Sequence, residues 1–99
     1  MSIDLPKRRA EELRHAVLDF LAARMALAFE PETILFRLIH SRILDFQPQP
    51  DELTAALTFL ELYSPEPLIF RRTDVLGSSN FYQVTSAGVL AFERGALNP

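Results

Sequence analysis

His15 is the residue of this chain with the richest potential chemistry. It lies four residues after Glu11 and four residues before Asp19, a spacing that brings side chains together on one face of a helix. An imidazole between two carboxylates can bind a metal ion, or it can join a row of ion pairs on a solvated surface. Because His15 has no second histidine or cysteine at ligand spacing, we favour the ion-pair row and expect no metal site.

The remaining nucleophilic and phosphate-binding residue types form no catalytic pattern. None of the serines follows a nucleophile-elbow pattern, and the three glycines are too scattered to form a phosphate-binding loop. The absence of cysteine excludes disulfides, thiolate zinc sites and cysteine nucleophiles. We therefore expect a binding protein that is not an enzyme and needs no cofactor.

Two clusters of basic residues could contact phosphate groups. The first cluster is Arg71 and Arg72. Neutral side chains that can form hydrogen bonds follow it a few residues later. These side chains include Ser78, Ser79 and Asn80. The other cluster is 7–9, where Glu11 and Glu12 follow closely and offset the charge. The alternative interpretation is that both clusters are ordinary solvated charges, and that the arginines protect an edge strand from aggregation.

Composition and charge limit the class of protein. A chain of 99 residues with 48% hydrophobic content can bury one core, so we expect a single domain over residues 1–99. The net charge of -3 gives no long-range attraction to nucleic acid. Residues 43–70 contain no basic residue and five acidic ones, which are Asp45, Asp51, Glu52, Glu61 and Glu66. The chain shows neither a signal-peptide pattern nor an apolar run of membrane-spanning length, so we expect a cytoplasmic protein with no membrane partner.

Helical spacing of apolar residues predicts three helices in the first two thirds of the chain. The first spans about residues 5–25 and is followed by an extended segment at 27–30. Pro31 opens the second helix, which should end near Arg42. Asp51 is the expected N-cap of the third helix. The side chains that should face the core from the first helix are Leu13, Ala16, Val17, Phe20 and Leu21.

The last third of the chain predicts a hairpin and a closing helix. Residues 68–72 and 81–84 are rich in residues that favour strands, and residues 77–80 supply small residues for a turn. Thr85 can cap a final helix that stops at Gly95. The predicted fold is therefore α+β and mainly helical.

The run Tyr82-Gln83-Val84-Thr85-Ser86-Ala87-Gly88 resembles the Y-x-L-T-x-x-G signature that ends the wing in many bacterial winged helix-turn-helix regulators. The resemblance implies a three-helix core, a two-stranded wing and a short C-terminal helix. Tyr82 and Val84 would fill the core from one strand face, Thr85 would cap the helix, and Gly88 would permit close packing. It also implies a DNA-binding transcription regulator whose third helix enters the major groove.

The expected outer face of the third helix departs from the pattern of that family. It carries no cation, although cation contacts to phosphate supply much of the affinity for DNA. If DNA is bound, the expected contacts are Thr54, Thr58, Arg71, Arg72, Ser78, Ser79 and Asn80. The alternative is a protein-interaction module with an acidic and apolar docking surface. Its expected contacts are Ala55, Glu61, Leu62, Val75 and Leu76.

A second apolar patch suggests self-association. Leu18, Ala22 and Met25 flank the core stripe of the first helix, and we expect them to lie on the surface. These side chains would support a homodimer through that helix.

Overall fold

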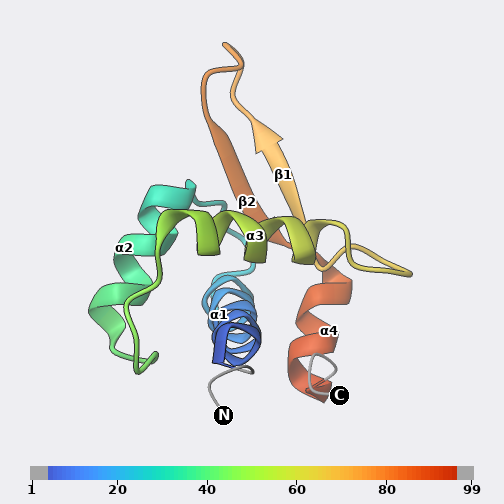
Figure 1. Ribbon diagram of the computed structural model, residues 1–99. Helices are drawn as coiled ribbons and strands as arrows, with labels where there is room; N and C mark the ends of the chain where they lie inside the picture. The colour runs from blue at the N-terminus through green and yellow to red at the C-terminus, as the bar shows by residue number, and fades with distance from the viewer. Residues whose placement is uncertain (1–4, 96–99) are drawn as a thin grey trace.

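The core is organised around α1 (Leu5–Ala22), in a computed structural model that describes residues 5–95. Figure 1 shows α1 nearly end-on, with α2 on one side, α4 on the other and α3 lying across it. All five side chains predicted to face the core from this helix are buried, as expected from their spacing. The chain is a mainly helical α+β protein, with four helices and an antiparallel hairpin among the described residues.

The prediction of an apolar surface patch on α1 was wrong at Leu18. Its side chain is 0% exposed, because α1 is covered by helices on several sides instead of one. Ala22 is half-buried, and Met25 alone of the three is well exposed. The helix also ends at Ala22, earlier than predicted, where the Arg24 guanidinium donates to the Phe20 carbonyl and turns follow.

The second and third helices both begin with proline. The last residue of α2 (Pro31–Ser41) is Ser41, because Arg42 adopts a left-handed conformation (φ 58°) that stops the helix. This agrees with the predicted end near Arg42. α3 (Pro50–Glu61) begins earlier than the predicted cap at Asp51. The observed N-cap is Gln49, which forms a reciprocal capping box with Glu52. Pro50 needs no hydrogen-bond acceptor and suits the first helical position, so the helix starts there.

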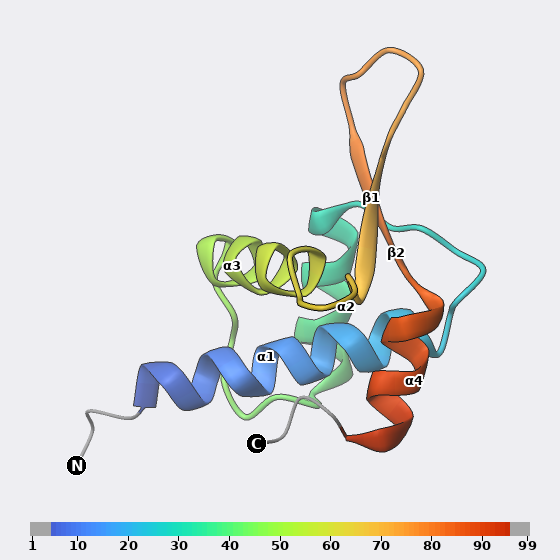
Figure 2. The same cartoon turned by 90° about the vertical axis from the view of Figure 1, so that its right-hand side faces the viewer.

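The hairpin extends away from the helices, as Figure 2 shows. β1 (Ile69–Thr73) pairs antiparallel with β2 (Asn80–Val84), in a register that joins Ile69 to Val84 and Thr73 to Asn80. The predicted turn at 77–80 lies too far along the chain, because Asn80 already pairs within β2. The extended segment at 27–30 is confirmed, since Phe29 forms two backbone hydrogen bonds with Tyr82 on the free edge of β2.

The predicted roles of Thr85 and Gly88 are confirmed at the start of α4 (Ser86–Arg94). Thr85 Oγ1 accepts from the Gly88 amide at 2.9 Å and donates to the Pro67 carbonyl at 2.7 Å. A Cβ on Gly88 would collide with the Leu68 carbonyl oxygen, so only glycine permits this packing. Tyr82 and Val84 are buried from the same strand face, and Gly95 ends the helix with a positive φ, both as predicted. No helix among residues 5–95 is long and apolar enough to cross a membrane.

Candidate functional site

The candidate binding surface is the outer side of α3 together with the adjoining hairpin, which we call the α3–hairpin face (Figure 1). The predicted outward residues of α3 do lie at the surface, because the core-facing stripe occupies the other side of the helix. These residues are Thr54, Ala55, Thr58, Glu61 and Leu62. Leu62, directly after the helix, leaves 74% of its surface exposed. Phe59 is also partly exposed, but the Arg14 guanidinium of α1 lies 3.7 Å from the centre of its ring.

An ion pair joins α3 to the hairpin within this face. Arg71 Nε lies 3.4 Å from Glu61 Oε2, with half of the arginine side chain exposed. The strand register explains the contact, because Arg71 lies opposite Tyr82 and so shares the strand face that turns toward the helices. One of the two predicted phosphate contacts is therefore already partnered by a carboxylate. Residues 69–72, Ile-Phe-Arg-Arg, show no alternation of apolar and polar side chains, so the sequence carried no signal of this orientation.

Arg72 lies on the opposite face of the hairpin. Its Nη1 donates to Gln83 Oε1 at 3.3 Å, and Gln83 Nε2 in turn donates to the Met25 carbonyl at 2.9 Å. The two neighbouring arginines therefore point to different sides of the hairpin. The predicted pair of cations does not form a single phosphate site.

The hairpin tip is organised by a carboxylate. Asp74 accepts hydrogen bonds from both the amide and the hydroxyl of Ser78, at 2.9 and 3.0 Å. The backbone bond from Ser78 is the main reason that the pKa of Asp74 lies below its usual value, so the tip is negatively charged at neutral pH. Asn80 accepts from Thr73, and the Ser79 carbonyl accepts from the Asp74 amide. Of the neutral residues predicted to contact phosphate, Ser78 therefore already donates to a carboxylate, and Asn80 is bonded to Thr73.

The basic cluster at residues 7–9 is divided between two structural contacts. Arg8 pairs with Glu12 along α1 at 3.6 Å. Arg9 makes two hydrogen bonds to Glu52, at 2.8 and 3.1 Å, and stacks over the Phe46 ring. This forked contact ties α1 to the first turn of α3. No local sequence pattern predicts this contact, because the partners are 43 positions apart.

The Arg9–Glu52 contact makes stability depend on pH. The hydrogen bond between the two side chains is the main cause that lowers the pKa of Glu52. The same bond is the main cause that raises the pKa of Arg9. A carboxylate whose pKa is lower in the folded state stabilises the protein at pH values above its unfolded-state pKa, which is about 4.3. This stabilisation is lost as the pH falls through the folded-state pKa. We expect Glu52→Gln to reduce the urea midpoint at pH 7, and the gap from wild type to shrink near pH 3.

The matched control for this prediction is Glu66→Gln, a change at an exposed carboxylate in the loop after α3. Urea unfolding followed by circular dichroism at both pH values provides the measurement. An equal loss for the two variants at pH 7 would contradict a specific role for the Arg9–Glu52 contact.

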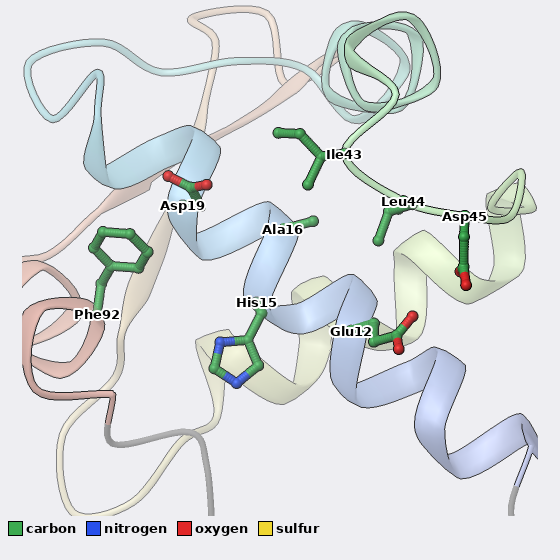
Figure 3. A pocket seen from close by; sticks show the side chains of 8 residues that line it. All are labelled: Glu12, His15, Ala16, Asp19, Ile43, Leu44, Asp45 and Phe92. Atoms are coloured by element: carbon green, nitrogen blue, oxygen red, sulfur yellow. The ribbon is translucent and has the colours of Figure 1, made fainter.

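His15 does not form the predicted row of ion pairs. Within the described part of the chain, neither Glu11 nor Asp19 forms an ion pair with it, and its Nε2 is buried without a hydrogen-bond partner. Figure 3 shows the imidazole turned away from the carboxylates of Glu12 and Asp19. No group of three or more histidine and acidic side chains among residues 5–95 is placed to hold a metal ion. Glu12, His15 and Asp19 instead line an open hollow of about 460 Å³ beside α1.

Comparisons of the chain with models of known protein families, with curated proteins and with solved structures found no match. The chemistry of the α3–hairpin face is therefore the basis for assigning a function.

Proposed function

We propose that this protein is a cytoplasmic winged-helix module that binds a protein partner through its α3–hairpin face. The order of helices, hairpin and closing helix supports the winged-helix assignment. Two local features also support it: Phe29 forms an isolated antiparallel bridge to Tyr82 of β2, and Thr85 and Gly88 fix the start of α4. A winged helix has no single function, so the choice of partner depends on the surface.

The observation that favours a protein partner is the ion pair between Arg71 and Glu61. It engages the hairpin arginine that faces α3, so Arg71 and Glu61 neutralise each other. α3 itself contains Asp51, Glu52 and Glu61 and no basic residue. With Glu52 paired to Arg9 and Glu61 paired to Arg71, α3 offers a phosphate backbone no net positive charge. A protein surface with apolar side chains would instead complement the exposed Leu62.

Leu62 is the expected centre of the docking surface. It is the most exposed large apolar residue beside α3, and it directly follows Glu61 of the Glu61–Arg71 pair. Burial of a leucine side chain in an interface contributes about 1.5–3 kcal/mol.

We expect Leu62→Glu to weaken capture of the partner by about tenfold or more, because a charge would enter an apolar contact. The measurement is quantitative mass spectrometry of proteins retained from cytoplasmic extract of the source cells, followed by affinity measurement on each purified candidate. Met25→Glu is the matched control, because Met25 is similarly exposed but lies on another side of the molecule. Equal retention of every protein by both variants would exclude this docking surface.

DNA binding is the second proposal, and Arg72 is the observation that favours it. Arg72 is exposed on the hairpin, and Thr54 and Thr58 line the outer side of α3, where a winged-helix regulator would contact its site. In the DNA-binding proposal, the remaining contacts to DNA come from Arg71 and from Ser78, Ser79 and Asn80 at the hairpin tip.

Fluorescence anisotropy with a mixed-sequence duplex separates the two proposals. A DNA-binding protein must show affinity at low salt that falls steeply as salt increases, and Arg72→Ala must weaken it further. Absence of binding by the folded protein at about 50 mM salt would exclude the DNA-binding proposal.

A further inference from the structure

Two adjoining hollows form a continuous groove along α1 and α2, away from the α3–hairpin face. One is the hollow of about 460 Å³ that contains Glu12 and Asp45 (Figure 3). The other, of about 300 Å³, contains Arg37. They are contiguous because Asp19 and Ile43 line both. We call the two together the α1–α2 groove.

The α1–α2 groove has opposite charges at its two ends. The first hollow is lined by Glu12, Asp19 and Asp45 and by no arginine or lysine, and because Glu12 pairs with Arg8 outside the hollow, Asp45 is the main charge at this end. Arg24 and Arg37 line the second hollow, where Asp19 is the only carboxylate among the lining residues. A ligand of one charge would be attracted to one end and repelled from the other. The groove therefore fits a partner whose charges run in the opposite order.

The middle of the groove is apolar. Ile43 stands where the two hollows meet and leaves 59% of its surface exposed. Phe92 of α4 lines the acidic hollow and is also exposed. An exposed isoleucine between two hollows can be buried against an apolar side chain of a partner.

We propose that the α1–α2 groove is the interface of a twofold-symmetric homodimer. A second copy turned by 180° about an axis near Ile43 presents its arginine end to the acidic end of the first, and the reverse contact follows by symmetry. Each favourable charge contact then occurs twice, with Arg37 of one copy facing Asp45 of the other. The same rotation brings the two Ile43 side chains together beside the axis. This proposal is independent of the function assigned to the α3–hairpin face.

Charge reversal tests the proposal without disturbing the core, because Arg37, Ile43 and Asp45 are all exposed. The dimer dissociation constant of the full chain is measured by sedimentation equilibrium. Arg37→Glu and Asp45→Arg should each raise it by about tenfold or more, since each creates two repulsive contacts in the dimer. The double variant should return to within about threefold of wild type, because the swapped charges again attract. Ile43→Glu should give a monomer.

Leu62→Glu is the control that keeps the two surfaces distinguishable, and it should leave the dissociation constant unchanged. Circular dichroism melting of each variant confirms that it is folded. Three results would overturn the proposal. They are a wild-type monomer at all concentrations up to about 1 mM, a dimer that Leu62→Glu dissociates, and a double charge swap that behaves no better than the single variants.

Discussion

Replacement of Gly88 by alanine is expected to destabilise the fold by about 3 kcal/mol, at the upper end of the usual cost of overpacking. The added methyl group would collide with the Leu68 carbonyl oxygen and would lie only 2.7 Å from Val84 Cγ2. Leu68 cannot retreat freely, since its carbonyl also accepts from the Thr85 amide and its amide donates to the Leu60 carbonyl. The strain therefore falls on the junction of α3, the hairpin and α4.

Thermal unfolding measures this effect, with an expected fall in Tm of roughly 15 °C for a domain of this size. Gly77→Ala is the matched control. Gly77 has a positive φ of 71°, but an added Cβ would meet nothing within 4 Å, so its cost should be about 1 kcal/mol. Equal effects of the two changes would show that the close packing at Gly88 does not stabilise the fold.

Tyr82→Ala should cost about 3 kcal/mol or more, because it removes a buried aromatic ring and leaves a cavity. The position is also where Phe29 pairs with β2, and Phe29 packs edge-to-face against Phe20 of α1 with ring centroids 5.0 Å apart. Loss of the ring should therefore loosen the contact of the hairpin with α1.

Urea unfolding compares this variant with Phe81→Ala, a neighbouring aromatic on the other face of β2. Phe81 is only half-buried, so its removal should cost about 1 kcal/mol. If Tyr82→Ala proves no more costly than Phe81→Ala, the base of the hairpin is not packed on the helices as described.

Local sequence signals predicted most of the elements. Pro31 and Thr85 marked helix starts, and Gly95 marked a helix end, because capping and proline effects depend on neighbouring residues alone. Leu18 shows where such signals fail. Its place beside the main stripe of α1 looked peripheral, but its burial depends on how many helices surround α1.

The candidate site was predictable in its apolar part and not in its charged part. Exposure of Leu62 and Ala55 followed from helical spacing. The pairing of Arg71 with Glu61 and of Arg9 with Glu52 required the third dimension, because neither pair is close in sequence. Those contacts decide which cations remain available, and the sequence therefore overstated the basic character of the hairpin.

The turn around Asp74 has a consequence for the entropy of binding. Ser78 donates to the Asp74 carboxylate, and the Gly77 amide donates to the Asp74 carbonyl. These bonds hold the loop in one conformation, although Val75 and Leu76 within it are almost wholly exposed. A disordered loop would lose conformational freedom on meeting a partner, at a cost of about 1–2 kcal/mol for each backbone residue fixed. Here folding has already restricted the backbone, so these two apolar side chains can be buried by a partner with little further ordering.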